Sequence, residues 1–183
     1  MNISKHYRFQ WRWCFCLLTF LAVSAEATPI FEFSIGASAY ELDATQKTGP
    51  NYHDDFENLS FTVAAYRSTS AKSAWGGAID YIKPVNRDEN FGSGTIVGFR
   101  PVNYFRRWSS NIATEMFFGA ARYDWEKVAV GYYLGMNIRY QSESSPFGFG
   151  LGYKYFQDLA YDSSFGDVIV DGPGTGLFVH YRF

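Results

Sequence analysis

Apolar and polar residues alternate along most of the chain after residue 27, which is the pattern of β-strands with one oily face and one polar face. The alternation is clearest over 128–141, where apolar or aromatic side chains recur at steps of two from Val128 to Tyr140. Eight such stretches, separated by turn-rich segments, can be counted: 30–42, 59–67, 74–83, 94–105, 112–123, 128–141, 147–157 and 174–183. Pro101 removes a ladder donor from the fourth stretch and predicts a bulge there. The pattern predicts an all-β chain without helical crossovers.

The lengths of the connections indicate how these strands are arranged. The connections after the second, fourth and sixth stretches are short: 68–73, 106–111 and 142–146. Those after the first and seventh, 43–58 and 158–173, are long and rich in Gly, Asp and Asn; 84–93 is intermediate and 124–127 is short. Short turns that alternate with longer loops are typical of up-and-down membrane barrels. We therefore expect a closed eight-stranded antiparallel up-and-down transmembrane β-barrel, with both termini on the short-turn side.

A soluble sandwich or a lipocalin-like barrel would show the same alternation with its apolar face turned inward. Two features favour the opposite orientation. The polar face carries mainly Gly, Ala, Ser and isolated charges, which suit a narrow, filled lumen. Aromatic residues lie at the short-turn end of the apolar face, where a membrane interface requires them: Phe31, Trp75, Tyr140 and Phe147.

Residues 1–27 have a different character from the rest of the chain. Basic residues precede an apolar run from Cys14 to Val23, and the small-residue site Ala25-Glu26-Ala27 follows it, which is the pattern of a cleaved secretory signal peptide. The run spans roughly 10 residues, whereas a membrane-spanning helix needs about 20, so an uncleaved anchor is the weaker alternative.

The expected mature chain is 28–183. Both cysteines of the sequence, Cys14 and Cys16, lie in the signal, so the mature chain predicts no disulfide and no lipid anchor. It carries fewer basic than acidic residues, and this balance speaks against nucleic-acid binding.

The chain ends in a strand whose outward positions are apolar at steps of two: Leu177, Val179, Tyr181 and Phe183. This strand resembles the C-terminal assembly signature of outer-membrane β-barrel proteins, in which the last residue is Phe. Over 28–183 the chain resembles the small eight-stranded OmpA/OmpX-type barrels, the group of the outer membrane protein β-barrel domain. The resemblance implies export to the outer membrane of a Gram-negative bacterium, insertion by the barrel assembly machinery, and contact with lipid and lipopolysaccharide. It implies no chemistry, and we expect a monomer.

Enzymes built on related barrels offer two comparisons. Lipid A deacylases of the PagL kind use a His-x-Ser pair, but the residue two positions after His180 is Arg182. Omptin-type proteases use opposed Asp-Asp and His-Asp pairs, which three adjacent residues, His53-Asp54-Asp55, do not supply. We therefore expect no catalytic residue, no cofactor and no metal site. The segment 53–57 is interpreted as a solvated loop, with divalent-cation or lipopolysaccharide contact as the alternative, and Gly-Pro-Gly at 172–174 as a turn.

Charged residues at inward positions predict what fills the barrel. They are Glu32, Asp80, Arg100, Glu115, Arg139, Lys154 and Arg182. Strand direction places them in two mixed-sign layers, with Asp80, Arg100 and Lys154 near mid-height. Since buried charges are costly unless paired, we expect Glu32 to pair with Arg182 and Glu115 with Arg139. Bridging residues would complete a polar plug: Tyr40, Tyr66, Tyr133 and Asn137.

The predicted function is that of a non-enzymatic integral outer-membrane protein whose loops 43–58 and 158–173 contact a surface partner. A small-solute channel is the main alternative, although side chains fill the interior of an eight-stranded barrel. A lipid A-modifying enzyme is the weaker one.

Overall fold

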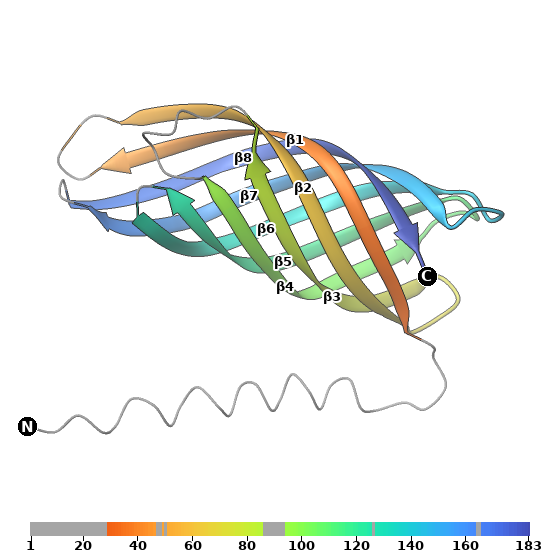
Figure 1. Ribbon diagram of the computed structural model, residues 1–183. Helices are drawn as coiled ribbons and strands as arrows, with labels where there is room; N and C mark the ends of the chain where they lie inside the picture. Colours follow the sequence, from red (N-terminus) through yellow and green to blue (C-terminus); the bar gives the residue numbers. More distant parts are fainter. Residues whose placement is uncertain (1–28, 47–48, 50, 86–93, 126, 164–165) are drawn as a thin grey trace, which may run out of the picture.

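The computed structural model describes residues 29–46, 49, 51–85, 94–125, 127–163 and 166–183. The expected signal peptide, 1–27, lies outside the described residues. Eight antiparallel strands close into one barrel in chain order (Figure 1), which confirms the predicted fold class. The strands are β1 (Ile30–Gln46), β2 (Tyr52–Ser68), β3 (Ser73–Pro84), β4 (Thr95–Arg107), β5 (Ile112–Trp125), β6 (Lys127–Gln141), β7 (Phe147–Ser163) and β8 (Gly166–Arg182). In these ranges we find no helix of the length and apolarity needed to cross a membrane.

The barrel closes where β1 pairs with β8, beginning at Glu32 opposite Arg182. Short turns join β2 to β3, β4 to β5 and β6 to β7, and the C-terminus lies at the same end of the barrel (Figure 1). Backbone hydrogen bonds close these turns, such as Trp108 N to Ile112 O at 2.9 Å. The ladder between β4 and β5 shifts register between Phe99 and Val102, so the bulge expected at Pro101 is present.

Four strands, β1, β2, β7 and β8, extend at one end by four or more residues beyond the ranges that the sequence pattern indicated. The segments 43–58 and 158–173, expected to be loops, lie mostly within the ladders of β1 with β2 and of β7 with β8. Gly-Pro-Gly at 172–174 is therefore part of β8 and the turn interpretation is wrong, since Gly172 pairs with Phe156 and Gly174 with Lys154. The strands continue because their inward side chains find an apolar interior to pack against.

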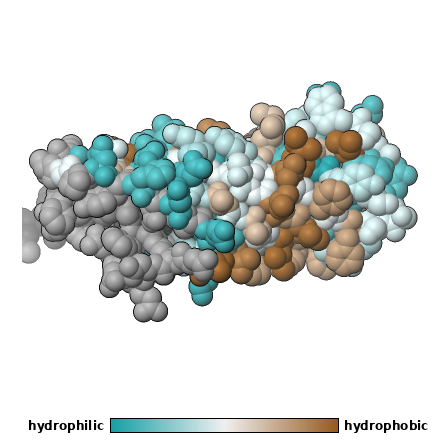
Figure 2. All heavy atoms as spheres, turned by 90° about the horizontal axis from the view of Figure 1, so that it is seen from above, coloured by the Kyte–Doolittle hydropathy of each residue, from teal (hydrophilic) through white to brown (hydrophobic). Residues whose placement is uncertain are grey.

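Large apolar side chains cover the middle of the outer wall, and Figure 2 shows them as a band between more hydrophilic ends. The four aromatic residues expected to form a girdle at the short-turn end are all exposed: Phe31, Trp75, Tyr140 and Phe147. An apolar outer belt of this kind fits the hydrocarbon core of a bilayer.

The hydrophobic pattern inverts above this belt. On β1 the outward positions change from Ala39 to the exposed Glu41, while the inward Leu42 is 2% exposed. On β2 the change is from Leu59 to the exposed Glu57. At the level of the belt, the outer face of the barrel is apolar. Beyond this level the same strands form a barrel of the soluble kind, with an apolar interior and a charged exterior. This change marks the level at which the long strands leave the apolar layer.

Candidate functional site

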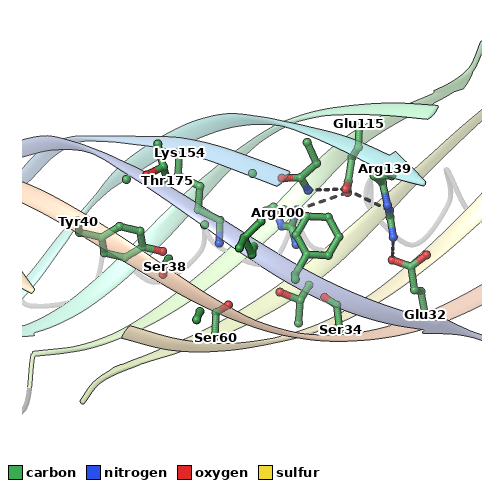
Figure 3. Close-up of a pocket in the computed structure, with 18 of the residues that line it drawn as sticks. Glu32, Ser34, Ser38, Tyr40, Ser60, Arg100, Glu115, Arg139, Lys154 and Thr175 are labelled. Carbon is green, nitrogen blue, oxygen red and sulfur yellow. Dashed lines mark hydrogen bonds and ion pairs between the residues drawn. The ribbon is translucent and has the colours of Figure 1, made fainter. Parts of the chain in front are cut away.

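The seven charged side chains expected in the lumen all point inward, and none is more than 15% exposed. Their ion pairs form one alternating chain along the barrel: Lys154, Asp80, Arg100, Glu115, Arg139, Glu32, Arg182. Figure 3 shows the part in which Glu115, Arg139 and Glu32 are joined. We call this set the charge chain.

Asp80 on β3 is fully buried and accepts hydrogen bonds from three side chains. Thr62 donates at 2.5 Å, Tyr133 at 2.6 Å and Arg100 at 2.9 Å. The ammonium of Lys154 lies 3.6 Å from the same carboxylate. A buried carboxylate with this many donors stays ionised without water.

Glu115 on β5 is the centre of the charge chain. It accepts from Tyr66 at 2.7 Å, from Asn137 at 2.7 Å, and from Arg139 at 3.2 Å and Arg100 at 3.4 Å. Because Arg100 contacts Glu115 as well as Asp80, the two layers expected from the sequence are a single network.

Glu32 on β1 lies between two guanidinium groups, those of Arg139 and Arg182, with Arg182 at 3.1 Å. Both pairs named from the sequence, Glu32 with Arg182 and Glu115 with Arg139, are therefore in contact. Among the expected bridging residues, Tyr66, Tyr133 and Asn137 donate to carboxylates, whereas Tyr40 packs edge-on against Phe156 with 5.1 Å between ring centroids.

Glycines on the inner face of β7 give these side chains room. A Cβ at Gly148 would collide with the ring of His180, and one at Gly150 with the ring of Phe178. Phe117 and Phe105 pack against the guanidinium groups, with Arg100 at 4.3 Å from the centroid of Phe117. The space left in this part of the lumen is about 50 Å³, room for a few water molecules.

An apolar cluster fills the lumen at the long-strand end, and we call it the apolar cap. It consists of Tyr40, Leu42, Ala44, Ile82, Ile96, Phe117, Ala121, Tyr123, Tyr133, Phe156 and Val170. The sequence interpretation missed it, because attention to inward charges left the apolar residues on the same faces unexplained. The available signal was the inversion of the alternation at the ends of the first, third and fourth stretches.

His53, considered from the sequence for a loop, lies instead on the outer face of β2, opposite Asp43 of β1. Its Nδ1 is 2.7 Å from Asp43 and its Nε2 is 2.9 Å from Asp55. Since carboxylates engage both ring nitrogens, neither is available as a general base. The side chain of Asp54 lies outside the described residues.

The other residue considered for catalysis, His180, lies inside the lumen near the short-turn end, and the side chain two residues later, Arg182, is bound to Glu32. Within the described part of the chain, no group of His, Cys, Asp and Glu residues has the geometry of a metal site. The geometry of the described residues thus combines a packed lumen with a charged exterior at the long-strand end.

The contacts of His53 predict a shifted titration. The hydrogen bond to Asp43 and the charge of Asp55 raise the pKa of His53 above its ordinary value. The bridge between β1 and β2 is therefore complete just below the raised pKa, where His53 is protonated and the carboxylates are ionised, and it is lost as the pH rises through that pKa. An NMR titration of the His53 ring in refolded protein checks this. Asp43→Asn should lower the pKa, whereas Asp124→Asn, on β5, should not change it. An ordinary pKa in the wild type would contradict the assignment.

Comparison with known proteins adds the fold relationship. No protein-family model matches the sequence, and no curated protein does. Neisserial surface protein A matches in structure with a TM-score of 0.50 and 11% identity, over 82% of this chain and 97% of that one. OprG from Pseudomonas aeruginosa gives 0.49 and 9%, over 87% and 98%. Ail, the attachment invasion locus protein of Yersinia pestis, gives 0.45 and 13%, over 83% and 98%.

At such identities the likeness concerns the fold, and it agrees with what the strand count, closure and outer belt indicate independently. The chain has the fold of the small eight-stranded outer-membrane β-barrels, as its resemblance to the OmpA/OmpX-type group implied.

Proposed function

We propose that this protein is a non-enzymatic, non-conducting barrel of the outer membrane that acts by presenting the projecting ends of its long strands to a partner outside the cell. The observation that carries the proposal is the inversion of the hydrophobic pattern above the outer belt. Strands that merely closed a membrane barrel would end near the belt, whereas β1, β2, β7 and β8 have 17 residues each. The extra length forms a folded projection with its own apolar core. We call this projection the platform; its described residues are 43–46, 52–58, 158–163 and 166–173.

The filled lumen argues against the channel alternative. An ion crossing the barrel would have to pass both the charge chain and the apolar cap, and in the cap Tyr40, Tyr133 and Phe156 pack ring against ring. Apolar constrictions oppose ion passage because they exclude water. Purified wild-type protein in a planar bilayer should therefore be silent.

The outer face of the platform has a distinct chemistry. Exposed carboxylates gather on neighbouring positions of β1 and β2: Glu41, Asp43, Asp55 and Glu57. A face of this kind suits partners with basic groups, or lipopolysaccharide phosphates held through divalent cations. Growth and envelope tests of a deletion strain, complemented with the wild type or with these four residues changed to amides, test the role. Mass spectrometry of lipid A from the same strains tests the enzyme alternative, which requires a changed lipid A in the deletion strain.

The proposed orientation predicts which positions can be labelled from outside the cell. The mature chain has no cysteine, so single cysteines can be introduced at Glu57 on the platform and at Ser144 in the β6–β7 turn, both exposed. A membrane-impermeant maleimide should label Glu57→Cys in intact cells, and Ser144→Cys only after the outer membrane is permeabilised. The reverse pattern would overturn the orientation, and labelling of neither position in permeabilised cells would show a failure of assembly.

A further inference from the structure

The charge chain begins and ends with a cation. Within the charge chain, four cations, Lys154, Arg100, Arg139 and Arg182, face three carboxylates, Asp80, Glu115 and Glu32. Every interior member has two partners of opposite sign, whereas Arg182 has only Glu32, which it shares with Arg139. An excess positive charge in a narrow lumen is unfavourable because little water is present to solvate it.

A small cavity lies at the Arg182 end of this chain. The space in it is about 10 Å³ and is partly open to solvent, so that one small particle, a water molecule or a small ion, can be placed there. The polar residues around it include Arg107, Asn111, Arg139, Gln141, His180 and Arg182. None of the described residues that line it carries a carboxylate, so the cavity is surrounded by groups that can donate hydrogen bonds.

Several of these groups have no partner in the described part of the protein. The Nε–H groups of Arg139 and Arg182 are buried without an acceptor. Both ring nitrogens of His180, which is 1% exposed, also lack a partner, and a neutral imidazole ring has one N–H donor. Buried polar atoms are rarely left without a hydrogen bond, because their desolvation is then uncompensated. The unsatisfied donors and the excess charge occur at the same end of the lumen.

We propose that this cavity binds one small monovalent anion of the size of chloride, with Arg182, Arg139 and His180 as its donors. The anion ends the charge chain with a negative charge, and it accepts the hydrogen bonds that the cavity leaves unmade. A water molecule could accept the same hydrogen bonds, but it would leave the charge excess in place. Arg107, exposed at the mouth, supplies a further positive charge along the entry path.

The opposite end of the charge chain is less suited to an anion. Lys154 lies 5.9 Å from the centroid of the Tyr133 ring, beside the apolar cap. Two carboxylates, Glu32 and Glu115, line the cavity beside Lys154 together with Arg100 and Arg139, whereas no described carboxylate lines the cavity at the Arg182 end. The site is therefore assigned to the Arg182 end alone.

Bromide is a suitable probe because it replaces chloride and scatters anomalously. Crystals of the refolded full barrel grown in sodium bromide should show an anomalous peak within hydrogen-bond distance of Arg182 and His180. In solution, the thermal unfolding midpoint of the protein in detergent should rise as the chloride concentration rises, with gluconate as the balancing anion that keeps the ionic strength constant. Density in the cavity without anomalous signal would mean water and would overturn the proposal, as would a peak only beside exposed cations, an adventitious ion only.

Variants separate the site from general electrostatics. Arg182→Gln should abolish both the peak and the chloride dependence. If that variant does not fold, Arg107→Gln still tests the proposal, because Arg107 makes no side-chain ion pair that the structure describes. It should raise the half-saturating bromide concentration about tenfold, equivalent to about 1.4 kcal/mol. Lys83→Gln, an exposed cation on the outer wall at the other end of the barrel, should change neither readout. An equal effect of Lys83→Gln and Arg107→Gln would refute the site.

Discussion

Replacing Glu115 with alanine is expected to lower the free energy of unfolding by about 3–5 kcal/mol, the loss typical of breaking a buried ion pair from one side. Glu115 is 2% exposed and accepts hydrogen bonds from Tyr66, Asn137, Arg100 and Arg139. Without it, Arg100 and Arg139 lie in the same narrow space with no carboxylate between them. Urea unfolding of the protein folded in lipid vesicles, followed by the heat-modifiable band in gel electrophoresis, measures the change.

Two controls give this result its meaning. Glu143→Ala removes a carboxylate from the exposed β6–β7 turn and should change the stability little. A double variant that replaces Glu115 and Arg139 together should lose less than the two single variants combined, because each single change leaves a charge unpaired. A loss below about 1 kcal/mol for Glu115→Ala would show that water enters the lumen and that the charges act independently.

Replacing Phe183 with aspartate is expected to prevent assembly of the barrel in the outer membrane. The backbone N–H of Phe183 donates to Phe31 O at 2.9 Å, which extends the pairing of β8 with β1 to the last residue. Its ring packs on Tyr181 with 4.8 Å between centroids, and Tyr181 packs on Phe147 of β7 at the same separation. A carboxylate at this position would face lipid at the seam that closes the barrel, and it would remove the terminal aromatic of the proposed assembly signature.

The matched control is Trp108→Asp. Trp108 is 61% exposed at the same end of the barrel, but it lies in the β4–β5 turn and takes no part in the closing seam. Outer-membrane fractions are prepared from cells that express each variant. The Trp108→Asp variant should be present there as a heat-modifiable band, whereas the Phe183→Asp variant should be absent. Wild-type levels of assembled Phe183→Asp would contradict the assembly role proposed for Phe183 and the terminal strand.

The apolar cap determines whether loss of a side chain from the charge chain should allow ions to pass. If the charge chain alone closed the lumen, Arg182→Ala would open a path for ions. The cap lies at the other end and is separate from the Arg182 contacts. Loss of Arg182 should therefore destabilise the barrel without conductance, and steady openings in bilayer recordings of that variant would show that the cap is not sealed.

Neighbouring-strand relationships could be predicted from the sequence because a strand alternates its side chains with a period of two. This period determined the eight strands, the outward aromatic residues and the inward charges. It also identified the pairs Glu32 with Arg182 and Glu115 with Arg139, because each pair joins adjacent strands, β1 with β8 and β5 with β6. The bulge at Pro101 followed from a missing backbone donor, which is likewise a property of the residue itself.

Contacts across the lumen were decided by the tertiary structure. Tyr66 of β2 reaches Glu115 of β5, and Tyr133 of β6 reaches Asp80 of β3. The charge chain itself is continuous because Arg139 of β6 reaches Glu32 of β1 and Lys154 of β7 reaches Asp80 of β3. Which residues meet there depends on the tilt and stagger of all eight strands together, and the residue pattern of a single strand does not contain these quantities. The length of the platform was likewise decided by contacts between strands that are distant in the sequence. Residues 43–46 and 52–58 are strand because inward residues of the other strands, such as Ile82, Ile96 and Val170, complete an apolar core with Leu42 and Ala44.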